Sequence, residues 1–165
     1  MGVMVKGAKY FESFAKADTI VFDKTGTLTE AQPRLACVLT TDGWSEDEVL
    51  RLSACLEEHF PHPVARAVVN AAHERGLEHR ERHAAVEYIV AHGIASSIEG
   101  RRAIIGSAHF VFEDESAQLE SDIKEQIESQ MQGLSPLYLA VDGTVVGVLG
   151  IEDPLKPGVR EAIAD

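Results

Sequence analysis

The apolar and polar positions of the chain follow a strand-like pattern near its start. A β-branched apolar run at 19–22 ends at Asp23 and predicts a buried strand that delivers this aspartate into a tight turn. After Pro33, the apolar run at 34–40 predicts a second strand. Ligands of open α/β sheets bind at the carboxyl edge of the strands, so Asp23 is a first candidate for chemistry.

Helical signals dominate the next segment. Ser45 and Glu48 form a capping-box pattern for a helix that runs to about residue 58. Pro63 suits the first turn of a second helix, and Gly76 is a natural stop for it. We therefore expect a pair of helices between residues 45 and 76.

From residue 85 onward, the alternation of apolar and polar positions is typical of strands. Asp142-Gly143 is the strongest hairpin signal, and Glu99-Gly100 is a second one. Strands are expected at 86–90, 94–98, 101–105, 137–141 and 144–149, and helices from residue 107, at 117–131 and at 156–165. The parallel-type strand near residue 20 and the strand–loop–helix at the end bracket this antiparallel segment, which predicts one domain inserted into another.

The composition is that of a soluble globular chain and argues against some partners. Of the 165 residues, 45% are apolar and 25% are charged, and the formal net charge is -12. A surface this negative repels phosphate backbones and anionic lipids, so we expect no nucleic-acid or membrane-surface binding. No apolar run approaches the roughly 18 residues needed to cross a bilayer, and we expect a cytoplasmic chain.

The spacing of the cysteines and histidines gives little support for a metal site built from these residues. The two cysteines lack CxxC spacing, so we expect buried thiols in a reducing compartment. His59 lies close to His62, and His79 lies four residues before His83, but neither pair has a third clear ligand. We interpret these histidines as part of a solvated surface.

The segment 23–29 reads Asp-Lys-Thr-Gly-Thr-Leu-Thr and combines a nucleophile with a cradle for phosphate. A carboxylate such as Asp23 can attack a phosphoryl group and form an aspartyl-phosphate. The small Gly26 and its flanking threonines leave N–H and hydroxyl donors free for phosphate oxygens, and carboxylate oxygen suits Mg²⁺. An aspartate that only caps a turn is the alternative that the residues by themselves leave open.

This seven-residue segment resembles the phosphorylation signature of P-type ATPases, which belong to the haloacid-dehalogenase-like superfamily. The resemblance implies that Asp23 is the phosphorylated residue. It also implies that Lys24 and Thr27 lie beside the phosphate, and that Asp23 and the backbone carbonyl of Thr25 contribute to an incomplete Mg²⁺ site.

A second resemblance rests on Glu57 and on His62, which precedes a proline at the start of the second helix. It is to the adenine-binding element of the heavy-metal (P1B) subgroup, where a Glu bonds the adenine and the His packs on its ring. Nucleotide-binding roles are thereby implied for Glu57, His62 and Gly93. Ala91 replaces the first glycine of the subgroup's Gly-x-Gly turn, and Ser107 replaces an asparagine, so a lower affinity or a shifted nucleotide preference is expected.

The segment 150–157 resembles the hinge through which this family returns to the phosphorylation domain. We therefore expect a membrane-proximal segment and the start of the phosphorylation domain at 1–32, a nucleotide-binding domain at 33–148, and the hinge with a truncated return at 149–165. The expected fold class is α/β. It consists of an antiparallel-sheet nucleotide-binding domain with flanking helices, inserted in an incomplete haloacid-dehalogenase-like phosphorylation domain.

The family motifs Thr-Gly-Asp and Gly-Asp-Gly-x-Asn-Asp are not in the sequence. Phosphoryl transfer needs several positioned groups together, so we expect the chain to bind ATP without turning it over. The resemblance implies a fragment from the cytoplasmic side of an ATP-driven heavy-metal exporter, whose partners are the remaining domains of the same pump. A phosphatase of the dehalogenase superfamily and a standalone nucleotide-binding module are the alternatives.

Overall fold

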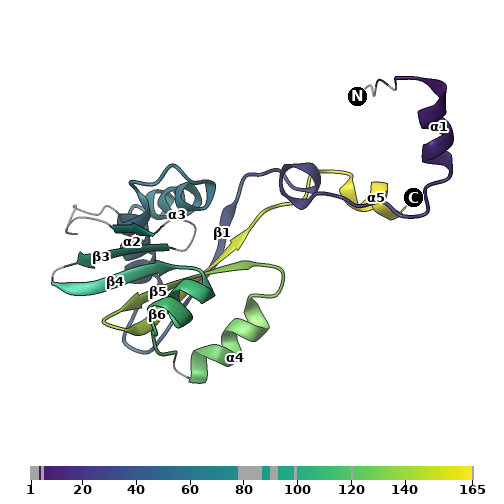
Figure 1. Cartoon of the computed structure of the whole chain (residues 1–165). Coiled ribbons are helices and arrows are strands. Elements are labelled where there is room, and N and C mark those ends of the chain that lie inside the picture. Colours follow the sequence, from purple (N-terminus) through teal and green to yellow (C-terminus); the bar gives the residue numbers. More distant parts are fainter. Residues whose placement is uncertain are drawn as a thin grey trace.

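The computed structural model describes residue 4 and residues 6–77, 87–89, 93–98, 100–119 and 121–164. Within these residues, six strands form one antiparallel sheet in the order β1-β6-β5-β4-β3-β2 (Figure 1). The elements in chain order are α1 (Ala8–Ala15), η1 (Lys24–Leu28), β1 (Arg34–Thr40), α2 (Glu46–Glu57), α3 (Pro63–Glu74), β2 (Glu87–Ile89), β3 (Gly93–Ile98), β4 (Arg101–Gly106), η2 (His109–Asp114), α4 (Ser121–Gln130), β5 (Ser135–Val141), β6 (Thr144–Glu152) and α5 (Val159–Ala164).

Helices cover both faces of this sheet. Successive side chains of a strand point to opposite faces, so in β5 Leu139 packs in the cluster with α2 and α3, whereas Tyr138 and Ala140 pack in the cluster with η2. Helix α4 contributes Ile123 to that second cluster. The arrangement confirms the predicted fold class, an antiparallel sheet with flanking helices.

The strongest hairpin signal is confirmed by the turn between β5 and β6. Asp142 and Gly143 have φ angles of 49° and 79°, which is the left-handed pair that a two-residue turn of this kind requires. The guanidinium of Arg101 donates to Asp142 at 2.7 Å, which lowers the pKa of that carboxyl. Gly100, in the predicted turn between β3 and β4, has a φ of 82°, and Glu99 lies outside the described residues.

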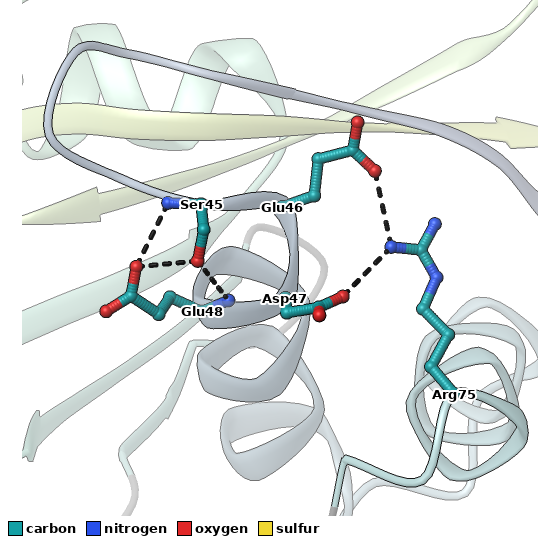
Figure 2. Close-up of polar contacts among 5 residues, drawn as sticks. All are labelled: Ser45, Glu46, Asp47, Glu48 and Arg75. Carbon is teal, nitrogen blue, oxygen red and sulfur yellow. Dashed lines mark hydrogen bonds and ion pairs between the residues drawn. The ribbon is translucent and has the colours of Figure 1, made fainter.

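The predicted pair of helices is present, and an ion-pair clamp, formed by Arg75 with Glu46 and Asp47, joins the start of α2 to the end of α3. The hydroxyl of Ser45 accepts from the N–H of Glu48 at 3.3 Å, and the carboxylate of Glu48 accepts from the N–H of Ser45 at 3.0 Å. The guanidinium of Arg75, at the end of α3, contacts Glu46 and Asp47, each at 3.3 Å (Figure 2). Because the clamp joins the start of α2 to the end of α3, the α2–α3 connection lies at the opposite end of the pair.

Two expected elements differ from the structure. The predicted buried strand at 19–22 is absent, and Ile20 and Val21 are 71% and 90% exposed. A strand of that kind needs neighbouring strands, and the described residues provide none beside it. The predicted helix at 117–131 begins only at Ser121, because Gln118 instead pairs with the β5–β6 hairpin. Its N–H donates to Gly143 at 2.8 Å, and its carbonyl accepts from Val145 at 2.9 Å.

The outer ends of β1 and β6 lead together to a smaller segment outside the sheet that contains η1 and α5 (Figure 1). Near this segment, Thr29 and Leu155 form an antiparallel bridge. The N–H of Glu30 donates to the carbonyl of Pro154, and the N–H of Lys156 donates to that of Leu28, both at 2.9 Å. No helix in the described part of the chain is both long enough and apolar enough to cross a bilayer.

Candidate functional site

A cavity of about 530 Å³ opens between the α2–α3 connection and strands β3, β4 and β5. It brings together Glu57, His62 and Gly93, the three residues that the sequence suggested for nucleotide binding. The lining residues are Glu57, Phe60, Pro61, His62, Val64, Gly93, Ile94, Ile105, Gly106, Ser107 and Leu137. Most of them are apolar, with a few polar groups among them, which is the usual chemistry of a pocket for a small organic ligand.

The backbone of the α2–α3 connection positions His62. The N–H of Phe60 donates to the carbonyl of Glu57 at 3.0 Å, and the N–H of His62 donates to that of Phe60 at 2.8 Å. Pro63 occupies the first position of α3, and Nδ1 of His62 accepts from the N–H of Val64 at 3.3 Å. Because Nδ1 is an acceptor here, the neutral ring carries its proton on Nε2.

Glu57 is the last residue of α2 and is only 8% exposed. Burial raises the pKa of its carboxyl from 4.5 to about 7. Near neutral pH, Glu57 therefore exists both as an acceptor-only carboxylate and as a protonated acid that can donate one hydrogen bond.

Gly93 is at the start of β3, where the backbone has no room for a side chain. A Cβ atom at this position would lie 2.2 Å from the Phe110 ring and 2.6 Å from the carbonyl oxygen of Ile105. Phe110 is fully buried, and its N–H donates to the hydroxyl of Ser107 at 3.3 Å. Ser107 thus lines the cavity and also holds the turn that carries Phe110. The neighbouring Ala91 and His92 lie outside the described residues.

Several apolar lining residues, among them Phe60, Ile105 and Leu137, were not suggested by the sequence. Phe60 lies only two positions before His62, so its place in the connection was a usable signal. Ile105 and Leu137 lie in strands β4 and β5 and cannot be distinguished from core residues by pattern alone.

The second candidate site is the loop that begins at Asp23. The carboxylate of Asp23 is exposed and accepts from the hydroxyl of Thr27 at 3.5 Å. Lys24 and Thr25 are also exposed, and Gly26 turns the loop with a φ of 79°. The four residues suggested for the phosphate site thus share one exposed turn of the chain.

The chemistry of this loop suits Mg²⁺, but the loop offers too few ligands for a complete site. One carboxylate from Asp23 and one carbonyl from Thr25 would supply two of the six oxygen ligands that Mg²⁺ prefers. Among the described residues, no group of three or more metal-binding side chains occurs. The histidines at 79 and 83 lie outside the described part of the chain.

The two candidate sites are separate in this structure. Asp23 does not line the 530 Å³ cavity, and Figure 1 shows η1 beyond the outer ends of β1 and β6, away from the α2–α3 connection. A further cavity of about 430 Å³ lies between residues 31–35 and one face of α3, and its polar side chains include Arg34, Arg66 and Asn70. It contains none of the residues suggested by the sequence.

Comparisons with known proteins agree on one family. A profile described as "Hydrolase: haloacid dehalogenase-like hydrolase" matches residues 17–165. A probable copper-exporting P-type ATPase V from Mycobacterium tuberculosis is 34% identical over 99% of this chain, and the chain spans 21% of that protein's length.

Solved structures also resemble the chain, and two of them illustrate the similarity. A zinc-transporting PIB-type ATPase in its E2.Pi state is 27% identical with a TM-score of 0.69, over 86% of this chain and 22% of that one. The N-domain of HMA8, a copper-transporting P-type ATPase, is 26% identical with a TM-score of 0.63, over 70% of this chain and 97% of that one.

Proposed function

The chain belongs to the haloacid dehalogenase-like hydrolase family and corresponds to the N-domain and part of the phosphorylation domain of heavy-metal P-type ATPases, and from this we propose that it binds ATP in the cavity at Glu57, His62 and Gly93. The observation that carries the proposal is the convergence of these three residues on one cavity. They come from the end of α2, the start of α3 and the start of β3.

The groups around the cavity complement an adenine base. The Glu57 carboxylate can accept from the exocyclic amine, and its protonated form can donate to a ring nitrogen. The flat imidazole of His62 and the ring of Phe60 offer apolar faces for packing against the base. Gly93 has no side chain and borders the cavity with its backbone.

In the intact pump, we propose, Asp23 is the phosphoryl acceptor. A carboxylate oxygen of Asp23 attacks the γ-phosphorus of ATP, an acyl-phosphate bond forms, and the bond to the bridging oxygen of the departing ADP breaks. Lys24 and the Thr27 hydroxyl contribute positive charge and a hydrogen-bond donor beside the transferred group. Mg²⁺ held by Asp23 and Thr25 would neutralise negative charge on the phosphates.

The separation of the two sites has a consequence for this mechanism. In the part of the chain that the structure describes, the outer ends of β1 and β6 connect the nucleotide cavity to the Asp23 loop. We therefore expect transfer to require that the two parts approach each other. We propose that the chain acts at the cytoplasmic face of a membrane, as part of a heavy-metal exporter whose other domains complete the site. The similar proteins include both copper and zinc pumps, so the transported ion stays open.

Calorimetric titration of the 165-residue chain with ATP tests the binding proposal. We expect a 1:1 complex that weakens about tenfold or more in Glu57→Leu, because this change removes the only polar group of α2 in the cavity. Glu74→Leu is the matched control, since Glu74 is exposed and does not line this cavity. Equal affinities for both variants would contradict the proposal.

Turnover is tested separately by phosphate release. We expect no steady release from the chain, because Asp23 has too few partners in it for catalysis. A steady release that is lost in Asp23→Asn would overturn this part of the proposal.

A further inference from the structure

We propose that Asp153 and Lys156 are positioning residues that hold the Asp23 loop in shape from the return segment, so that the loop's geometry depends on the segment that follows β6. The importance of this for phosphoryl transfer rests on the proposed role of Asp23. The contacts themselves do not depend on that role.

Both backbone polar groups of Gly26 are held. Its N–H donates to the hydroxyl of Thr29 at 3.1 Å, and its carbonyl accepts from the ammonium of Lys156. Gly26 has a φ of 79°, a conformation that a tight turn needs and that an unrestrained glycine leaves easily. Lys156, 130 positions further along the chain, therefore restrains the centre of the loop directly.

Asp153 restrains Gly26 through a relay of two hydrogen bonds that pass through the Thr29 hydroxyl. Its carboxylate accepts from the hydroxyl of Thr29 at 2.5 Å, and that hydroxyl in turn accepts from the N–H of Gly26. Thr29 is only 1% exposed, so little water competes for these bonds. Hydrogen bonds in such a chain polarise one another, and the charge of Asp153 strengthens the outer bond.

The relay begins at the end of the sheet. β6 ends at Glu152, so Asp153 is the first residue beyond the strand. Its second carboxylate oxygen is buried without a partner among the described residues, so the hydroxyl of Thr29 is the group that holds this side chain. A change in the direction in which β6 leaves the sheet would therefore move Asp153 and, through Thr29, would move Gly26.

The backbone ladder keeps these side chains in register. Thr29 is bridged to Leu155, and the N–H of Lys156 donates to the carbonyl of Leu28 at 2.9 Å. The ladder sets which residues are opposite one another, whereas the two side chains reach beyond it to Gly26. Removal of either side chain should loosen the loop while the ladder and the sheet remain.

Amide exchange with water, measured by NMR on the 165-residue chain, tests this proposal. In Asp153→Ala and in Lys156→Met, we expect the Gly26 amide to exchange about fivefold faster or more, which is the effect of losing one net hydrogen bond. The amide shift of Thr27 should move in both variants. The amides of Leu139 and Val148 in the central sheet should not change.

Rescue by conservative variants separates positioning from general stability. Lys156→Arg keeps a cationic donor and Thr29→Ser keeps the hydroxyl, so both should retain slow exchange at Gly26, whereas Thr29→Val should not. Lys124→Met is the matched control, because Lys124 is an exposed lysine of α4.

Two results would overturn the inference. One is unchanged exchange at Gly26 in both Asp153→Ala and Lys156→Met. The other is a uniform rise that includes Leu139, because it would mean that these side chains stabilise the whole fold and not the loop. Failure of ATP to bind in the cavity would leave these exchange rates untouched, so the two proposals can fail separately.

Discussion

Nδ1 of His62 accepts a hydrogen bond from the backbone N–H of Val64 at 3.3 Å, so one imidazole caps α3 and also borders the cavity. A side chain at this position satisfies one of the free N–H groups at the start of a helix. A substitution of His62 therefore changes helix stability and ligand contact together, unless the new side chain keeps the cap.

Asparagine separates these two roles. In His62→Asn we expect a stability within about 0.5 kcal/mol of the parent chain, because asparagine is among the best N-cap residues. ATP should bind about 5- to 100-fold more weakly, the cost of losing the packing of an aromatic ring on a base. His62→Ala should lose both properties. Urea unfolding and calorimetry measure the two effects, and full ATP affinity in His62→Asn would exclude ring packing.

Because the pKa of Glu57 is raised in the folded chain, we expect the free energy of unfolding to fall as pH rises. The folded chain holds the proton of Glu57 up to a pKa of about 7, whereas the unfolded chain releases it near 4.5. The burial penalty is therefore absent below 4.5, grows between 4.5 and 7, and is constant above that range. Between pH 4.5 and pH 7, the free energy of unfolding of the parent chain should fall by up to about 3 kcal/mol relative to that of Glu57→Gln. Urea unfolding of both chains at pH 4.5 and pH 8 measures the difference, and parallel pH profiles would contradict the assignment.

Gly93→Ala tests whether the start of β3 must keep its position beside the cavity. The new methyl group would meet the Phe110 ring and the Ile105 carbonyl at distances that no relaxed packing allows, so we expect a loss of about 1–3 kcal/mol in stability and weaker ATP binding. Gly43→Ala is the comparison, because it has open space around it and is strained only by a φ of 85°. It should cost stability without changing ATP affinity. If Gly93→Ala bound ATP as well as the parent chain does, the position of the start of β3 would not matter for binding.

Ser53 offers a test of the core that is independent of ligand. It is 0% exposed in the middle of α2, and its hydroxyl has no hydrogen-bond partner in the part of the chain that the structure describes. Ser53→Ala removes an unsatisfied polar group and improves helix propensity, so we expect a gain of about 1 kcal/mol. A loss of stability in urea unfolding would mean that the hydroxyl has a partner after all.

Local signals in the sequence predicted the elements whose causes are local. The turn at Asp142 and the cap at Ser45 are decided by residues next to one another, and both are confirmed. The segment 19–22 is the opposite case, because a buried strand depends on neighbours that no local pattern can supply. The start of α4 was also misjudged, since Gln118 is taken from the helix by a contact with the distant β5–β6 hairpin.

The candidate sites also combine residues that the sequence suggested with contacts that only the structure shows. Glu57 and His62 were suggested by a resemblance, and the structure adds that they share a cavity with Gly93. The contacts of Thr29 with Asp153 and of Gly26 with Lys156 join residues more than a hundred positions apart, and no pattern within either segment predicts them. The burial that raises the pKa of Glu57 likewise appears only when the sheet closes over α2.

Binding of ATP in the cavity is tested by an NMR titration of the ¹⁵N-labelled chain with ATP, with AMP as a comparison. We expect the largest amide shifts at Glu57, Phe60, His62, Gly93 and Ser107, with both nucleotides. Shifts that avoid these residues and gather around the smaller cavity at Arg34, Arg66 and Asn70, or no saturable shifts at all, would contradict it.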